Sequence, residues 1–164
     1  MVRFAAILAA AALLAACDKS AGEGGGEAGE VEVEEAPFLR KFPPSTSGGP
    51  AEALRTVVRD PVVWADLWAK ANAHIAPVPG APRVDFSKEM VAFAGLGDRK
   101  SGGFSVEIVG TLEEGGKLVL LVAERDPPSG APVAAVVTAP WHAVVLAKSD
   151  LPVEWRKYEA PRGK

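Results

Sequence analysis

The spacing of apolar side chains changes near residue 77, from a helical period to strand-like patterns. After Asp60 and Pro61, apolar residues recur at the spacings expected for one face of a helix: Trp64, Leu67, Trp68, Ala71 and Ile75. Asp60 suits the N-cap and Pro61 the first helical position. We therefore predict one amphipathic helix that begins at Pro61 and ends before the proline-rich loop 77–82.

Strand-like patterns dominate the chain after this loop. Apolar and polar residues alternate over 104–108, which places Phe104, Val106 and Ile108 on one face of a strand. A turn is predicted at 113–116. Further strands are predicted within 51–59, 90–96, 118–123, 133–138, 141–148 and 153–158. This order predicts an α+β fold, with the amphipathic helix packed on an antiparallel β-sheet or on a partly closed barrel.

The first 17 residues have the pattern of a bacterial export signal. Arg3 precedes the apolar run Phe4–Ala16, which is shorter than the roughly 20 residues of a membrane-spanning helix. The sequence Leu14-Ala15-Ala16-Cys17 resembles the lipobox of bacterial lipoproteins, in which the cysteine thiol carries a diacylglycerol. We expect a signal peptide over 1–16 and lipidation of Cys17, the one cysteine of the chain. The alternative is an ordinary secretory signal with an incidental cysteine.

The segment after Cys17 is strongly acidic. Residues 18–36 contain seven acids, one lysine and five glycines, a composition typical of a flexible spacer. We interpret 17–50 as an acidic Gly/Glu-rich tether with a loose lead-in segment, and 51–164 as the folded domain. The net charge of −3 then resides in the tether, because residues 37–164 carry 16 basic and 14 acidic groups. A near-neutral domain gives no reason to expect nucleic acid as a partner.

The loop Gly97-Asp98-Arg99-Lys100-Ser101-Gly102-Gly103-Phe104 is the most distinctive polar feature of the domain. It places two cationic side chains on a tight connection between strands, where paired glycines permit positive φ or a close backbone approach. Such a loop suits a carboxylate or the backbone of an extended peptide. The alternative is a hairpin turn with solvated charges. The glycine–lysine spacing does not match a phosphate-binding loop.

Few residues are suited to catalysis or metal binding. One cysteine and two histidines argue against a cysteine-cluster or polyhistidine metal site, and we expect no cofactor. His142, beside Trp141, is a candidate ligand, acid/base or pH-sensitive contact, or simply a hydrogen-bonded structural histidine. Ser101 lacks the sequence of a nucleophile elbow. Glu89 and Glu107 form a carboxylate pair only if their strands meet, and otherwise are surface carboxylates.

Three stretches together resemble the C-terminal domain of the protease-complex subunit PrcB, over about residues 54–148. They are 59–68, 84–108 and 138–148. The family pattern G-x-R-x-T-G-G-Y matches residues 97–104, with Ser101 in place of threonine and Phe104 in place of tyrosine. The family's later P-Y-H matches Pro140-Trp141-His142. The resemblance implies a non-enzymatic lipoprotein that binds or stabilises a protease.

We therefore expect a lipid-anchored module of the bacterial cell envelope, facing the periplasm or the exterior, which binds an extracytoplasmic protein. The predicted binding residues come from the Gly-rich loop and the late strand: Gly97, Arg99, Ser101, Gly102, Gly103, Phe104, Trp141 and His142. Its membrane contact is the lipid on Cys17. We expect no catalytic residue. The alternatives are a protease inhibitor that uses the same loop as a wedge, an enzyme acting on envelope peptides through His142, or a passive envelope protein with no dedicated partner.

Overall fold

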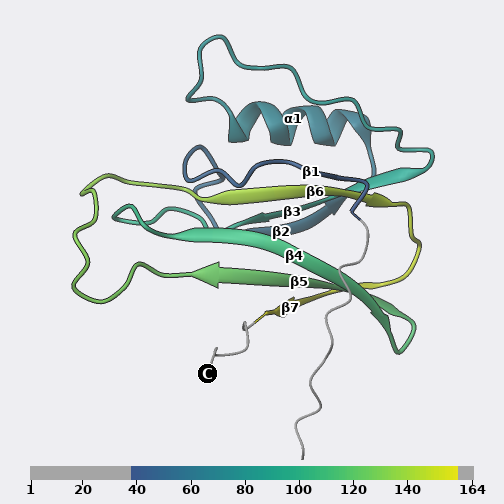
Figure 1. The fold of residues 1–164 in the computed structure, drawn as a ribbon. Coiled ribbons are helices and arrows are strands. Elements are labelled where there is room, and N and C mark those ends of the chain that lie inside the picture. Colours follow the sequence, from purple (N-terminus) through teal and green to yellow (C-terminus); the bar gives the residue numbers. More distant parts are fainter. Residues whose placement is uncertain (1–37, 159–164) are drawn as a thin grey trace, which may run out of the picture. The chain divides into compact units, whose positions relative to one another are not determined.

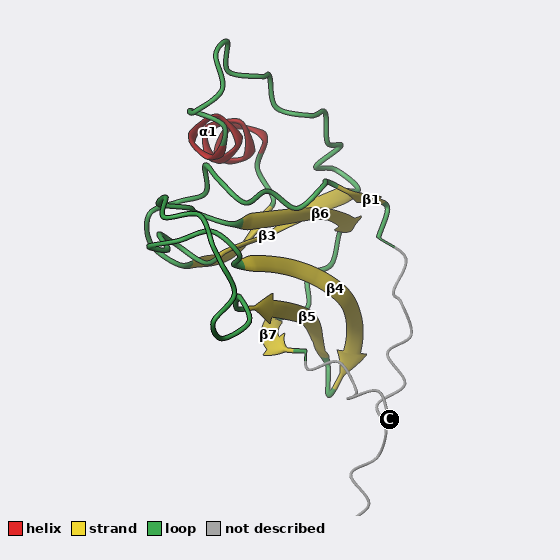
Figure 2. Ribbon diagram, turned by 60° about the vertical axis from the view of Figure 1, so that its left-hand side comes forward, coloured by secondary structure: helices red, strands yellow, loops and turns green. Residues whose placement is uncertain are grey.

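The computed structural model describes residues 38–158. They form one helix and two β-sheets, which are stacked as three layers with the four-stranded sheet in the middle (Figures 1 and 2). The elements are β1 (Arg40–Lys41), β2 (Leu54–Val58), α1 (Pro61–Ala71), β3 (Glu89–Gly95), β4 (Ser105–Glu114), β5 (Lys117–Arg125), β6 (Trp141–Ala147) and β7 (Val153–Lys157).

The two sheets have the strand orders β1-β6-β3-β2 and β4-β5-β7. All neighbours are antiparallel except β5 and β7, which run parallel. The broad α+β class is confirmed. The expectation of purely antiparallel sheets is wrong, because the chain crosses to the middle sheet as β6 before it returns as β7. Neither sheet closes into a barrel.

Helix α1 begins where the sequence predicts. Asp60 is the N-cap, and its Oδ1 accepts hydrogen bonds from the backbone N–H groups of Val62 and Val63 at 2.8 and 3.0 Å. The helix ends at Ala71, so Ile75 lies outside it and is 41% exposed. Val62 and Val63 are also exposed, at 74% and 54%. Apolar side chains therefore point to solvent as well as to the core, and the predicted amphipathic character is not confirmed.

Two hydrophobic cores lie on opposite sides of the middle sheet. On β3, Val91 and Phe93 face the helix, whereas Met90, Ala92 and Ala94 face the other sheet. The period of two along a strand produces this division. Because β3 is buried on both faces, its sequence is an apolar run rather than an alternating one. Of the lead-in residues, Phe38 and Phe42 pack against the cores, whereas Leu39 is 50% exposed.

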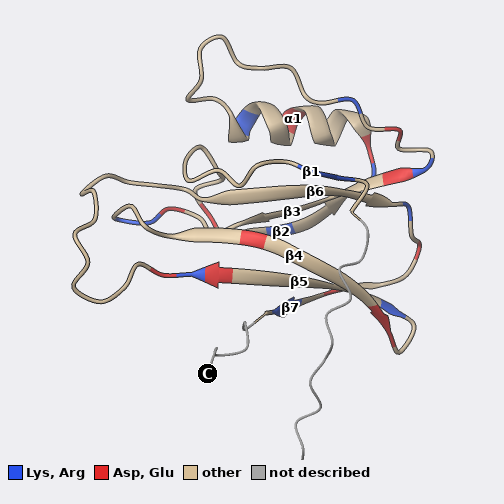
Figure 3. Ribbon diagram, viewed as in Figure 1, with Lys and Arg blue, Asp and Glu red and all other residues tan. Residues whose placement is uncertain are grey.

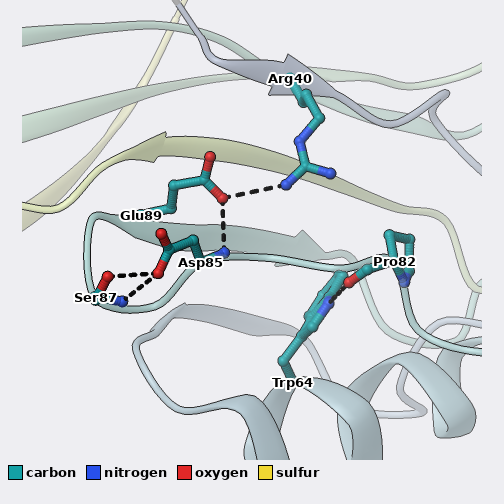
Figure 4. Close-up of polar contacts among 6 residues, drawn as sticks. All are labelled: Arg40, Trp64, Pro82, Asp85, Ser87 and Glu89. Carbon is teal, nitrogen blue, oxygen red and sulfur yellow. Dashed lines mark hydrogen bonds and ion pairs between the residues drawn. The ribbon is translucent and has the colours of Figure 1, made fainter.

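Polar contacts fix the loop between α1 and β3 (Figure 4). The indole N–H of Trp64 donates to the carbonyl oxygen of Pro82 at 3.0 Å. The carboxylate of Glu89 accepts from the backbone N–H of Asp85 at 2.9 Å and from Arg40 at 3.2 Å. Glu89 thus joins β3 to β1, which is a structural role for this carboxylate.

The structure overturns one predicted strand. Residues 133–138 form an irregular loop, with a single β-bridge between Thr138 and Arg99. The loop leaves Val133, Val136 and Val137 exposed. A run rich in β-branched residues forms a strand only where a neighbouring strand offers an edge, and this run lies on the Gly-rich loop instead.

Candidate functional site

Two loops at one end of the sheets pack together and form a continuous surface, which we call the two-loop surface: residues 97–104 and 126–138. The backbone N–H of Arg99 donates to the carbonyl of Thr138 at 2.7 Å, and the N–H of Thr138 donates back at 2.9 Å. The Thr138 hydroxyl donates to the Ser101 carbonyl at 2.8 Å, and the Gly102 N–H to the Ala134 carbonyl at 2.9 Å. Four hydrogen bonds therefore hold the second loop on the first.

The outer part of this surface is apolar and uncharged. Val133, Val136 and Val137 are 40%, 53% and 66% exposed. Residues 127–138 contain no charged side chain, and the ribbon of this long loop is tan throughout in Figure 3. Charges lie beside it, on the loop that carries Asp98, Arg99 and Lys100 (Figure 3). An exposed apolar patch with a polar margin is typical of protein contact sites.

The three predicted glycines of the first loop have different environments. Gly97 is buried with φ +76°, and a Cβ there would lie 2.7 Å from the backbone nitrogen of Ala53. Gly103 is exposed with φ +92°, and its Cβ would lie 2.8 Å from Pro127. Gly102 has no such close neighbour. Gly97 and Gly103 are therefore required by the packing of the loops, whatever the surface binds.

Three side chains of the first loop are half-buried: Arg99, Ser101 and Phe104. Arg99 places its guanidinium 5.6 Å from the ring centroid of Phe104, within the range of a cation–π contact. Phe104 in turn packs against the core between the sheets. Ser101 contributes its carbonyl to Thr138. The predicted residues Arg99, Ser101, Gly102, Gly103 and Phe104 thus do lie together, within the two-loop surface.

Trp141 and His142 do not join this surface. They are 3% and 1% exposed and, as neighbours on β6, lie on opposite faces of the middle sheet. Trp141 stacks on Phe93 with ring centroids 5.4 Å apart, and its indole N–H donates to the Ser47 carbonyl at 3.1 Å. A partner reaches neither side chain without unfolding this region. We therefore leave both out of the proposed binding surface.

Both ring nitrogens of His142 are engaged inside the protein. Nδ1 accepts a hydrogen bond from the backbone N–H of Ile108 at 2.9 Å. The proton therefore resides on Nε2, which donates to the carbonyl of Phe42 at 2.9 Å. The bond to β4 occurs beside its register shift between Ile108 and Gly110. His142 joins β6, β4 and the segment after β1, so no proposal for catalysis runs through this ring.

The buried position of His142 predicts a pH dependence of stability. Burial lowers its pKa below 6.5, against smaller opposing effects of the Phe42 hydrogen bond and of Glu107. Between the folded and unfolded pKa values, the unfolded chain binds more protons, so stability falls as the pH drops below about 6.5. We expect a loss of up to about 1.4 kcal/mol per pH unit in urea unfolding of the wild type.

We expect His142→Gln to remove this pH dependence of the free energy of unfolding, measured in urea from pH 7.5 to 5. His74 is exposed, and His74→Gln keeps the pH dependence. Two carboxyl groups with shifted pKa values do not account for a change in stability over this pH range. The pKa of Asp85 is lowered by hydrogen bonds from Ser87, and that of Glu154 by hydrogen bonds from Arg156 and Lys117. Both shifts lower the pKa of a carboxyl group, whose ordinary value already lies below the pH range of this titration. Equal slopes for wild type and His142→Gln would contradict the assigned role.

Within residues 38–158, no three Cys, His, Asp or Glu side chains converge as a metal site. In the same part of the chain, every buried side-chain nitrogen or oxygen has a hydrogen-bond partner. A buried polar atom without a partner would have indicated a missing ligand.

Sequence reasoning missed the second loop of the site. The signals were its length between β5 and β6 and the residues Pro127, Pro128, Gly130 and Pro132. Loops of more than about 12 residues in small domains are commonly functional. The run Val133–Thr138 concealed this signal because its composition favours a strand.

Comparison with protein families gives a match in the central part of the chain. Residues 90–147 match the PrcB C-terminal family. This match confirms the resemblance predicted from the sequence, over a shorter range than predicted. No curated protein and no solved structure gave a significant match.

The PrcB C-terminal match spans the strands from β3 to β6, and with them both loops of the two-loop surface. Helix α1 and β2 lie before it, and β7 lies after it. Cys17 and the predicted signal peptide and tether up to residue 37 lie outside the described residues. Among the described residues, no helix is long and apolar enough to cross a membrane.

Proposed function

We propose that this protein is a lipid-anchored, non-enzymatic binding module of the bacterial cell envelope. Its two-loop surface contacts an extracytoplasmic protein, and the PrcB C-terminal match makes a protease the first candidate partner. The observation that carries the proposal is the exposure of three valines on a loop held by four hydrogen bonds. A fixed apolar loop loses little conformational entropy when a partner covers it.

Charged side chains beside the exposed valines favour a particular kind of partner. Arg99 is held over Phe104, so its guanidinium is oriented before binding. Lys100, beside it, is exposed. Cations at the rim of an apolar patch favour a partner with carboxylates around an apolar contact, and such charges act mainly on the association rate. The surface thus combines an apolar centre with a charged rim that carries two cations and the exposed Asp98.

Substituting the two most exposed valines of the two-loop surface tests its role in binding. We expect Val136→Asp with Val137→Asp to reduce recovery of the bound envelope protein at least about tenfold in pull-downs from detergent-solubilised membranes, because it places two charges in the apolar contact. The matched control is Val62→Asp with Val63→Asp, an exposed valine pair on α1. Equal recovery with both double variants would remove the two-loop surface from the proposal.

The lipid anchor is tested separately. We expect Cys17→Ser to move the protein from the membrane pellet to the soluble envelope fraction, because acyl chains contribute about 0.8 kcal/mol per buried CH₂ group. Fractionation of cells with an immunoblot measures this distribution. Ser101→Ala serves as a control that leaves the predicted lipobox intact. An unchanged membrane fraction for Cys17→Ser would show that the cysteine is incidental.

A protease inhibitor and a protease stabiliser predict different kinetics of the bound protease. A purified protease that is stabilised by the module keeps its activity longer on incubation, whereas an inhibited protease turns over less substrate from the start. The two-loop surface serves either role, so the assay of initial rate and lifetime decides between them.

A further inference from the structure

A second surface lies where the two sheets expose their end strands. Among the described residues, β2 is the end strand of the middle sheet and β7 the end strand of the other sheet. A groove of about 460 Å³ opens between them. It is lined by Arg55, Thr56, Val57, Arg59, Asp150, Leu151, Pro152, Val153 and Trp155.

The groove has an apolar floor with an arginine at each end. Val57 packs against the core between the sheets, together with Leu151, Val153 and Trp155. Arg55 and Arg59 are two residues before and after Val57, so all three belong to the same side of β2 and its extension. At about 3.3 Å per residue, the arginine positions are roughly 13 Å apart. The order along β2 is therefore cation, apolar, cation at alternate positions.

One arginine is held by β5 and the other by the connection between β6 and β7. Arg55 forms an ion pair with Glu124 at the end of β5. Arg59 donates to the backbone carbonyl of Ser149 at 3.1 Å. A guanidinium has five N–H donors, so Arg59 keeps donors for a further carboxylate. Asp150 also lines the groove, and its carboxylate repels a carboxylate of a bound segment.

We propose that this groove binds an extended segment of a partner protein, which adds to the free edge of β2 and carries the pattern acid–x–apolar–x–acid. Residues directly opposite in paired strands have Cβ atoms about 4.5–5.5 Å apart. The apolar residue of the segment therefore faces Val57 and Trp155, and its two acids face Arg55 and Arg59. Backbone pairing provides affinity and the alternate side chains provide specificity. This inference does not rest on the two-loop surface.

The test is an NMR titration of the full chain with the peptide acetyl-Thr-Glu-Thr-Val-Thr-Glu-Thr-amide. We expect shifts in the backbone amides of 54–59 and 153–155 and in the indole N–H of Trp155, with residues 127–138 unchanged. Arg59→Glu weakens binding at least about tenfold. Arg83→Glu, an exposed arginine outside the groove, leaves it unchanged. Asp150→Asn strengthens it.

Peptide variants test the recognition pattern. Replacing one Glu of the peptide by Lys restores binding to the Arg59→Glu variant, and replacing Val by Ser abolishes binding. Two further peptides carry N-methyl groups on alternate backbone amides, one on the odd-numbered and one on the even-numbered residues. Only one of these peptides loses binding, because only one set of amides faces β2. The proposal is overturned by no shifts up to about 1 mM peptide, by equal affinity for Arg59→Glu, or by equal binding of the Ser peptide.

Discussion

Replacing His142 by alanine is expected to lower the free energy of unfolding by about 4 kcal/mol. The ring is 1% exposed and fills space between the sheets. Truncation of a buried side chain of this size costs about 3–5 kcal/mol. It also leaves the N–H of Ile108 and the carbonyl of Phe42 without their partner, and a buried group without a partner costs about 1–3 kcal/mol. Partial relaxation and entry of water offset part of the sum.

Two conservative variants separate the contributions of the ring. His142→Asn keeps an acceptor near the Nδ1 position for Ile108, and His142→Gln keeps a donor near the Nε2 position for Phe42. We expect each to cost less than His142→Ala in urea unfolding at pH 7.5. His74→Ala is the control, since His74 is exposed, and its effect stays within about 0.5 kcal/mol. A cost below about 1 kcal/mol for His142→Ala would show that the ring is not a structural link.

Replacing Gly97 by alanine is expected to cost about 3 kcal/mol. Its φ of +76° disfavours any side chain by about 1–2 kcal/mol. A Cβ would also lie 2.7 and 2.8 Å from backbone atoms of Ala53 and Ala51, which cannot move aside like a flexible side chain. Urea unfolding without any partner measures this cost. It tests whether Gly97 acts through the fold rather than by contact with a partner.

Two other glycines serve as controls for Gly97→Ala. Gly115 has φ +57° with no atom within 4 Å of a built Cβ, so Gly115→Ala shows the backbone strain alone, about 1–2 kcal/mol. Gly80 has equally open surroundings and no positive φ, so Gly80→Ala stays within about 0.5 kcal/mol. If Gly97→Ala costs no more than Gly115→Ala, the close approach to Ala51 and Ala53 does not constrain the loop.

The sequence predicted those helix ends, turns and strands that depend on residues close together in the chain. The start of α1 follows from Asp60 and Pro61, because an N-cap needs only neighbouring N–H groups. The hairpin between β4 and β5 follows from Gly115 and Gly116, both with positive φ. The strands predicted within 51–59, 90–96, 118–123, 141–148 and 153–158 are also present. Each was recognisable from a short apolar or alternating run.

The remaining features depend on contacts between distant residues. The role of His142 depends on Phe42, 100 positions earlier, and no pattern around Trp141-His142 contains that partner. The parallel pairing of β7 with β5 depends on the path of the chain through β6. The sequence did hold one unused clue: neighbours on a strand face opposite ways, so Trp141 and His142 cannot both line one surface.

The two-loop surface combines a fixed backbone with exposed apolar side chains. The hydrogen bonds of Arg99, Gly102 and Thr138 fix the backbone, yet Val136 and Val137 remain exposed. A loop without such hydrogen bonds could rearrange its backbone and turn its apolar side chains away from water. A fixed loop with exposed valines has a surface that a partner can cover, and covering apolar area contributes about 25 cal/mol per Å².

Site-specific photo-cross-linking in intact cells tests this proposal most directly. A photoreactive amino acid replaces Val137 in the full chain, and Val62, which is similarly exposed on α1, in a control. We expect one discrete cross-linked product from position 137 that is absent from position 62 and is lost when Arg99→Glu is added. The same products from both positions, or none from position 137, would contradict a partner at the two-loop surface.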